Sequence, residues 1–584
     1  MIKRSLVTFF KGYTLSQHVM RLLLALLIPL LVTNLISSHF FTSKDYYSDV
    51  NFPVFICSVA LLYLIFLFIK NQRIIGISLL SFALAYLCLT ANHAQSYLFS
   101  FGACLCICMI VIYFGTFPVY FTPGKRTTLI IITLLIFAFT VSTGIVCCLK
   151  YFNHATPCFD FGIFSQMFYN MKESGLCVTT CERDQLLSHF AVHFSPIYYL
   201  LLPIYCLFPS PVTLLIAQGA IISSGVIPLY FLGRHFKLSN GATIVFSIIY
   251  LLYPAFLGGI FWYLHENSFL APLLLWLLYF SEKEKTLPAL ISAMLTLTVK
   301  EEAPLYVAVC ALYFIFIRKN YKCNLFLFVL SVIYFTAVTQ LMGIFGEGIM
   351  SDSRYGDYIY DGGGIFTVVK AVVQNPVYAI YQIFTAEKLI FALQMLAPLC
   401  FLPVVIKKPS RLILLIPFIL VNLMTSYPYQ FDIGFQYAFG SGAIFFYLAL
   451  STYSELSHRH NSKALLCALL SSIIIFSGGY MSTFNYLDFY CSDAERRESV
   501  TYAFSLIPED ASVICSTFFL PNLSQREVIY ELESSSKGAE YVAVDLRYPE
   551  NESYVEKYLS EGYSLIYYSE NAVALLAESA DREQ

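Results

Sequence analysis

The chain has 584 residues, of which 58% are hydrophobic and only 12% are charged. Because a soluble domain averages roughly 25% charged residues, this composition excludes a water-soluble enzyme and a disordered chain. The 35 basic and 37 acidic residues give a net charge of −2, which leaves no excess positive charge to attract a nucleic acid.

The remaining class is a polytopic membrane protein, whose spans can be followed from the N-terminus. Lys3, Arg4 and Lys11 precede the first apolar run, Val19–Ile36. We therefore predict an uncleaved first helix and a cytoplasmic N-terminus. Four further runs follow, namely Pro53–Ile69, Ile74–Thr90, Tyr97–Thr116 and Leu129–Leu149. The basic turns between them then lie in the cytoplasm, and the segment 150–194 lies outside.

The apolar segment Ser195–Phe208 is only 14 residues long and contains Pro196 and Pro203, so we interpret it as a re-entrant or partly embedded helix. With this interpretation, every later basic turn falls on the cytoplasmic side. If Ser195–Phe208 crossed the membrane completely, all of these basic turns would lie outside. The later spans are Pro211–Gly233, Ala242–Leu264, Ser268–Phe280, Thr286–Val299, Ala303–Ile317, Cys323–Phe345, Leu389–Ile406, Leu412–Tyr427, Ala438–Tyr453 and Ala464–Met481. The total is about fifteen spans.

The C-terminal part has a different pattern. Glu495–Gln584 is polar and contains short runs typical of β-strands, at Ala511–Phe519, Glu527–Glu531, Tyr541–Leu546 and Ser564–Tyr568. These runs predict a small extracytoplasmic α/β domain, in which no catalytic pattern is visible. The chain then divides into N-terminal membrane helices (1–127), a membrane core (128–482) and this domain (483–584).

Ionisable and amide side chains gather at the outer ends of the predicted spans. They are Asp160, His189, His193, His265, Glu266, Lys300, Glu301, Glu302, Gln436 and Tyr437. The spans on either side of Lys300 are only about 14–15 residues long, at the lower limit for crossing a bilayer. We therefore expect these charges below the lipid surface, in a cavity that faces outward.

Each of these residues also has a simpler interpretation. Asp160 could cap the helix that begins near Ile163, and His265 with Glu266 could form a solvated turn. Lys300 could form a structural ion pair with a neighbouring glutamate. The case for a functional site depends on the whole set lying on one side of the membrane.

Histidines and cysteines raise the question of metals and disulfides. His189 and His193 are one helical turn apart and could bind a metal with His265, or could be interfacial histidines. A divalent metal ion is thus one alternative, and no other cofactor is indicated. The outer cysteines Cys158, Cys177, Cys181, Cys491 and Cys515 could form disulfides.

Four motifs in order resemble those of a known family. They are Phe159-Asp160-Phe161-Gly162-Ile163-Phe164-Ser165-Gln166, His193-Phe194-Ser195-Pro196-Ile197, His265-Glu266 and Val299-Lys300-Glu301-Glu302. The family consists of uncharacterised polytopic prokaryotic membrane proteins, distantly related to the GT-C glycosyltransferases such as protein O-mannosyltransferases and aminoarabinose transferases. The resemblance covers roughly residues 151–453. It implies an all-α GT-C-like core with an outer catalytic loop (150–194) and a second outer loop (346–387).

The resemblance also implies a reaction. GT-C enzymes transfer a sugar from a polyprenyl-phosphate carrier on the non-cytoplasmic face, and Asp160 occupies the place of their catalytic acid. Gln436-Tyr437 stands where relatives would have a His-Tyr pair, which removes a titrating group from that position.

The roles follow from the chemistry of inverting transfer. We assign Asp160 as the base, Lys300 as the cation for the leaving phosphate, and Glu301 or Glu302 as the residue that orients Lys300. Substrate binding is assigned to His193, His265, Glu266, Glu302, Gln166, Gln436 and Tyr437. The Tyr- and Gly-rich loop Gly346–Glu387 could close over the acceptor.

The expected partners are therefore a lipid-linked sugar donor, an acceptor in the cell envelope and membrane lipid, with no nucleic acid. A transporter or flippase for a lipid-linked sugar is the alternative, since it would use a similar polar cavity. We find no internal repeat, and the polar groups lie at one face rather than at the midplane, which counts against transport.

Overall fold

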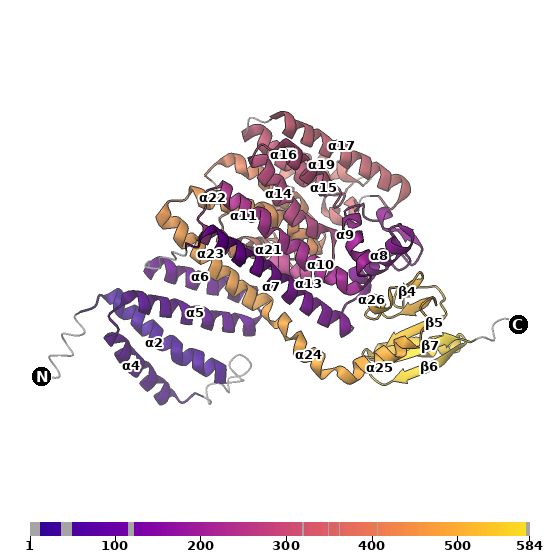
Figure 1. The fold of residues 1–584 in the computed structure, drawn as a ribbon, viewed down its shortest axis with the longest axis horizontal. Coiled ribbons are helices and arrows are strands. Elements are labelled where there is room, and N and C mark those ends of the chain that lie inside the picture. The colour runs from indigo at the N-terminus through magenta and orange to yellow at the C-terminus, as the bar shows by residue number, and fades with distance from the viewer. Residues whose placement is uncertain are drawn as a thin grey trace.

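The computed structural model describes residues 12–36, 50–114, 122–317, 321–348, 350–360, 363–405 and 407–579. Lys3, Arg4 and Lys11, on which the predicted N-terminal orientation depends, lie outside these ranges, as do Arg318, Lys319, Gly362 and Ile406. Four N-terminal helices, α2 (Leu15–Ile36), α4 (Phe52–Phe68), α5 (Gln72–Ala94) and α6 (Tyr97–Phe114), are drawn at one end of the molecule in Figure 1. The helices α5 and α6 pack against α23 (His458–Gly479), which joins this group to the rest.

The central bundle surrounds one large apolar core. Its helices are α7 (Lys125–Phe152), α10 (Pro211–Ser224), α11 (Val226–His235), α12 (Asn240–Leu251), α13 (Pro254–Phe261), α14 (Leu270–Glu282), α15 (Thr286–Leu297), α16 (Ala303–Ile317), α17 (Tyr321–Phe345), α21 (Ala386–Leu396) and α22 (Phe439–Glu455). Pro211 and Pro254 occupy first turns, where the missing N–H of proline costs no helical hydrogen bond. The pairs α10/α11 and α12/α13 each form one long run broken by a kink.

Eight helical runs in the described residues are long and apolar enough to cross a membrane. They are Leu15–Ile36, Gln72–Ala94, Tyr97–Phe114, Lys125–Phe152, Pro211–His235, Asn240–Phe261, Tyr321–Phe345 and His460–Gly479. Five further apolar helices are shorter, including α9 (Tyr198–Leu207) and the helices α15 and α16 on either side of Lys300. The mostly helical, polytopic class is thus confirmed. Several of the predicted spans are shorter than a regular bilayer crossing.

Two predicted segments have a different local structure. Leu412–Tyr427 is not a regular α-helix but a 3-10 helix, η6 (Pro409–Leu415), followed by a π-helix, η7 (Phe418–Leu423). Asn422 in η7 donates to the carbonyls of Gln430 and Tyr437, which joins η7 to the segment that follows it. The outer loop 346–387 is largely helical, with α18 (Ser351–Arg354), η4 (Gly356–Tyr358), α19 (Ile365–Gln374) and α20 (Pro376–Ile383).

The C-terminal part forms the predicted sheet domain, which is drawn at the opposite end from the N-terminal helices (Figure 1). After η10 (Met481–Asn485), α24 (Tyr486–Ser492) and α25 (Ala494–Ser505) lead into strands β3 (Val513–Cys515), β4 (Ile529–Glu531), β5 (Tyr541–Asp545), β6 (Tyr563–Ser569) and β7 (Val573–Glu578). The strand order is β4-β3-β5-β7-β6, with β4, β3 and β5 parallel and β7 antiparallel to both its neighbours. Three short helices, α26 (Leu520–Leu523), η11 (Pro549–Asn551) and α27 (Glu552–Ser560), connect the strands.

The domain is joined to the core by specific contacts near the end of α7. Arg547 donates to the carbonyl of His154 (2.7 Å), and Arg496 donates to the carbonyl of Asn153 (2.9 Å). A Cβ at Gly162 would lie 2.5 Å from Leu520 Cδ2, so α26 packs directly on the loop that precedes α8 (Ile163–Ser174). The sheet domain therefore supports the first outer loop of the core.

Close packing inside the bundle gives a first testable prediction. A Cβ at Gly258 in α13 would lie 2.0 Å from the carbonyl oxygen of Ile433 and 2.6 Å from the Tyr480 hydroxyl. We expect Gly258→Ala to lower the free energy of unfolding by about 1–3 kcal/mol, because the backbone at Ile433 and the Tyr480 side chain must both shift. Gly343→Ala on α17 is the control, since its Cβ meets nothing within 4 Å. Thermal unfolding in detergent measures both; equal midpoints would contradict the packing described.

Candidate active site

A fully buried ion pair forms the centre of the polar cluster. Lys300 follows α15, and Glu266 begins the 3-10 helix η3 (Glu266–Phe269) after α13. Lys300 Nζ lies 2.8 Å from Glu266 Oε1, and both side chains are 0% exposed. Burial alone would lower the pKa of Lys300, but the Glu266 and Glu301 carboxylates outweigh it and hold that pKa above its ordinary value. The pair is therefore charged in the folded protein.

Two neighbours hold Glu266 in place. The Tyr198 hydroxyl, at the start of α9, donates to Glu266 Oε2 (2.7 Å). His265 Nδ1 lies 2.9 Å from the same oxygen. Gln218 on α10 accepts from the backbone N–H of His265 (2.8 Å), which fixes the turn itself. The pKa of Glu266 lies well below its ordinary value because His265 and Lys300 outweigh the cost of burial.

His265 connects this buried pair to Asp160. Its Nε2 lies 3.8 Å from Asp160 Oδ2 and 3.0 Å from the amide nitrogen of Gln436. Asp160 belongs to the π-helical turn η1 (Cys158–Gly162), and the indole N–H of Trp262 donates to its Oδ2 (3.2 Å). The Asp160 side chain is 30% exposed, in contrast to the buried residues behind it. The cluster thus presents one accessible carboxylate in front of a buried cation.

A second branch of the cluster runs through Glu301. His193 Nδ1 lies 2.9 Å from Glu301 Oε1, and the backbone N–H of Phe194 donates to Oε2 (3.3 Å). Burial would raise the pKa of Glu301, but His193 and Lys300 lower it to about 2. Burial and Lys300 together lower the pKa of His193. At neutral pH, a neutral His193 therefore donates its Nδ1 proton to an ionised Glu301.

Arg354 completes the cluster and was not identified from the sequence. It lies in α18 of the second outer loop, is buried, and stacks over the rings of Tyr437 (5.0 Å) and Tyr427 (5.1 Å). Lys300 lies 5.6 Å from the same Tyr437 ring. The atoms Arg354 Nη1 and Glu302 Oε1 are buried and have no hydrogen-bond partner. Two cations therefore flank Tyr437, and polar atoms beside them remain available to a ligand.

The structure brings most of the predicted site residues together. Asp160, His193, His265, Glu266, Lys300, Glu301, Gln436 and Tyr437 are linked by the contacts above, and Glu302 adjoins them in the chain. The direct partner of Lys300 is Glu266, whereas the sequence suggested Glu301 or Glu302. Sequence reasoning also missed Tyr198, Trp262 and Arg354. Of these, only Trp262 had a signal, because it is one of two tryptophans and stands close to His265.

Gln166 does not belong to the cluster. Its amide nitrogen donates to Thr180 Oγ1 (2.8 Å) and to the carbonyl of Glu527 (3.0 Å), while its oxygen accepts from Thr180 N (2.9 Å). Because its amide nitrogen and oxygen are both hydrogen-bonded, Gln166 links α8 to the sheet domain. The prediction that it binds substrate is therefore corrected.

The predicted metal ligands are engaged elsewhere. His189 pairs with Glu182 (3.0 Å) and His193 with Glu301, so neither histidine is free to approach His265. Among the described residues, no three His, Cys, Asp or Glu side chains are placed to hold a metal ion. The outer cysteines are free thiols, and Cys158, Cys181 and Cys515 pack together in the apolar core of the sheet domain.

The buried Glu182–His189 pair, in the first outer loop, gives a prediction about pH. Burial would lower the pKa of His189, but Glu182 outweighs it and raises that pKa above 6.5; for Glu182, His189 outweighs burial and lowers the pKa below 4.5. The stability that protonated His189 contributes is fully present below pH 6.5 and is lost as pH rises through its raised pKa. The stability that ionised Glu182 contributes is present above pH 4.5 and is lost as pH falls through its lowered pKa.

We therefore expect Glu182→Gln to lower stability by about 3 kcal/mol. The difference from wild type should be largest between pH 4.5 and 6.5 and should narrow at higher pH. Glu173→Gln is the control, because its ion pair with Lys172 is exposed at the surface. Unfolding midpoints measured from pH 4 to 9 test this, and a pH-independent difference would refute it.

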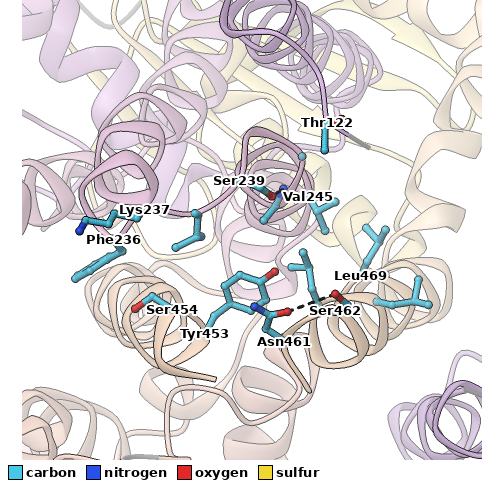
Figure 2. A pocket seen from close by; sticks show the side chains of 15 residues that line it. Thr122, Phe236, Lys237, Ser239, Val245, Tyr453, Ser454, Asn461, Ser462 and Leu469 are labelled. Atoms are coloured by element: carbon cyan, nitrogen blue, oxygen red, sulfur yellow. Dashed lines mark hydrogen bonds between the residues drawn. The ribbon is translucent and has the colours of Figure 1, made fainter. Parts of the chain in front are cut away.

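A separate pocket of about 450 Å³ lies at the opposite end of the α12/α13 run (Figure 2). Its lining includes Lys237, Ser239, Tyr453, Asn461 and the leucines of α23. The residues that line it include no aspartate, glutamate or histidine within the described chain. It therefore lacks the acid–base groups that the outer cluster contains.

Comparison with known proteins agrees with this architecture. The profile of the family described as "Predicted membrane protein (DUF2079)" matches residues 150–567. No curated protein matches the sequence. The crystal structure of ArnT from Cupriavidus metallidurans bound to undecaprenyl phosphate is similar, with a TM-score of 0.51 and 10% identity over 79% of this chain and 99% of that one. ArnT in the apo state has a TM-score of 0.40 and 11% identity, over 72% and 93%. The likeness at this identity concerns the fold, which is that of a GT-C membrane protein, as the resemblance implied.

Proposed function

This chain belongs to the DUF2079 family of predicted membrane proteins, and from that premise we propose that it is a membrane glycosyltransferase. The donor is a sugar on a polyprenyl-phosphate carrier, and the acceptor is a glycan, lipid or protein of the cell envelope. The observation that carries the proposal is the accessible Asp160 joined through His265 to the buried Glu266–Lys300 pair. Support also comes from the GT-C fold, since the ArnT structure of similar fold holds undecaprenyl phosphate.

The reaction requires one base and one positive site. Asp160 takes the proton from an acceptor hydroxyl, whose oxygen attacks the anomeric carbon of the donor. The bond between that carbon and the phosphate oxygen breaks, and polyprenyl phosphate leaves with the electron pair. Because attack and departure occur on opposite faces, the anomeric configuration inverts.

The departing phosphate needs positive charge nearby. Lys300 and Arg354 flank the Tyr437 ring and supply it, and Glu266 holds the Lys300 ammonium group in a fixed position. Glu302 and Gln436 each have a buried oxygen without a partner, which makes them the residues to bind sugar hydroxyls. His193 and Glu301 fix the loop on which Lys300 lies.

The site then faces the non-cytoplasmic side. The basic turns at Lys70, Lys125 and Lys283 mark the cytoplasmic ends of the spans, while Asp160 and Glu266 follow the opposite ends of α7 and α13. In this orientation the sheet domain is extracytoplasmic, beside the catalytic loop.

The test uses purified protein in lipid nanodiscs and a panel of undecaprenyl-phosphate sugars. We expect one donor to lose its sugar slowly to water or to an added acceptor. Mass spectrometry measures the free undecaprenyl phosphate that this transfer releases. If one donor binds but is never consumed, the transporter alternative gains support. If no donor binds, the proposal is wrong.

A further inference from the structure

A pocket of about 490 Å³ lies in the sheet domain, apart from the cluster of buried charges. Its lining includes Ser516 and Phe518 after β3, Glu533 after β4, and Asp545, Tyr548 and Glu550 at the end of β5 and beyond. All three strands are parallel, so these residues come from the carboxyl ends of strands at one edge of the sheet. Figure 1 shows this part of the domain beside the core.

The position of the pocket is the one where open α/β sheets bind ligands. From β3 the chain continues through α26 to β4 on one side, whereas from the neighbouring strand β5 it continues through η11 and α27 to β6 on the other side. The connections therefore leave the carboxyl edge in opposite directions, and the pocket lies at this switch point. Crevices at such points are the usual ligand sites of this architecture.

The lining indicates the class of ligand. The rings of Phe518 and Tyr548 lie nearly parallel, with centroids 5.8 Å apart and planes 16° apart, and Tyr548 is partly exposed. Within the described chain, no lysine, arginine or histidine lines the pocket. The nearby Arg547 pairs with Asp545, donates to the His154 carbonyl and lies over the Phe518 and Tyr548 rings. Carboxylates without a free cation disfavour a phosphate, whereas acids, hydroxyls and an aromatic face suit a sugar ring.

The pocket is connected to the loop that bears Asp160. The backbone N–H of Thr517, another lining residue, donates to both oxygens of Glu533 (3.1 and 3.2 Å). The Thr517 hydroxyl accepts from the backbone N–H of Cys158 (3.1 Å), two residues before Asp160. A residue that lines the pocket is therefore hydrogen-bonded directly to the turn that contains Asp160.

We propose that this pocket binds a non-phosphorylated sugar of the acceptor and so holds the acceptor beside Asp160. The inference rests on the proposed glycosyltransferase function and adds to it the class of acceptor, a glycan or glycosylated molecule. The sugar stacks on Tyr548, and its hydroxyls donate to Glu550 and Glu533.

The test measures oligosaccharide binding by the full-length protein in nanodiscs, using saturation-transfer NMR. The probes are cellotetraose, chitotetraose and mannotetraose. Tyr548→Ala removes the stacking surface, and Glu550→Gln removes an exposed charge without affecting the core. Tyr568→Ala is the matched control, since Tyr568 is an exposed tyrosine on β6 at the far edge of the sheet.

We expect at least one probe to bind wild type and the Tyr568→Ala variant, and to bind Tyr548→Ala at least about tenfold more weakly. Failure of all three probes to bind, or equal binding by Tyr548→Ala, would overturn the inference. Undecaprenyl phosphate release from the donor panel is measured in parallel. If wild type releases no undecaprenyl phosphate from any donor, the proposed function is overturned. If wild type cleaves a donor but binds no oligosaccharide, or if Tyr548→Ala binds as tightly as wild type, only the acceptor site is overturned.

Discussion

Replacing Asp160 by asparagine should lower the rate of undecaprenyl phosphate release by about 10²–10⁴-fold. Asparagine keeps the size of the side chain and can still accept the hydrogen bond from Trp262, but it cannot take a proton from the acceptor. Because Asp160 is partly exposed, the exchange leaves no buried charge unpaired. We therefore expect the unfolding midpoint to remain within experimental error of wild type.

The matched control is Asp488→Asn, which removes an exposed carboxylate from α24 near the sheet domain. It should release undecaprenyl phosphate at the wild-type rate. Mass spectrometry of single-turnover samples gives the rate for each protein. If Asp160→Asn retained more than a tenth of the wild-type rate, another group would have to be the base.

The second large effect concerns the buried pair. Lys300→Met leaves Glu266 charged and without its cation in a fully buried position. Removal of one partner of such a pair costs about 3–5 kcal/mol, and we expect that loss of stability together with loss of donor cleavage. Lys285→Met is the control, because Lys285 is exposed at the other end of α15.

The double variant Lys300→Met/Glu266→Gln separates stability from catalysis. With no charge left in the pair, most of the stability should return, whereas donor cleavage should not. Thermal unfolding and undecaprenyl phosphate release are measured on the same preparations. If the double variant were as unstable as Lys300→Met, Glu266 would not be the main partner of Lys300.

Much of the architecture could be predicted from the sequence, because long apolar runs and the basic turns between them are strong signals. The sheet domain was recognised from short β-rich runs, but β7 was missed. Its sequence, Val573–Glu578, is rich in alanine and leucine, which favour helices, and only pairing with β5 and β6 makes it a strand. The π-helix η7 was also missed, because its apolar sequence, Phe418–Leu423, is equally typical of a regular α-helix.

The residues of the candidate site could be predicted better than the contacts between them. Polar residues at the ends of apolar spans are conspicuous, so Asp160, Glu266 and Lys300 were identified one by one. Which acid meets Lys300 depends on how the hairpins pack, and its chain neighbour Glu301 turns instead to His193. Arg354 comes from a loop whose helices are too short to be recognised from periodicity.

The attachment of the sheet domain has a consequence for how the protein is made. The strand β7 lies between β5 and β6, yet it follows every membrane helix in chain order. The ribosome must therefore finish all of the helices before the sheet can close and before Thr517 can support Cys158. A nascent chain halted before β7 would carry all the buried charges but an unsupported Asp160 turn. Such a chain would be inserted without this support, so the proposed activity should appear only after β7 has been made and has paired with β5 and β6.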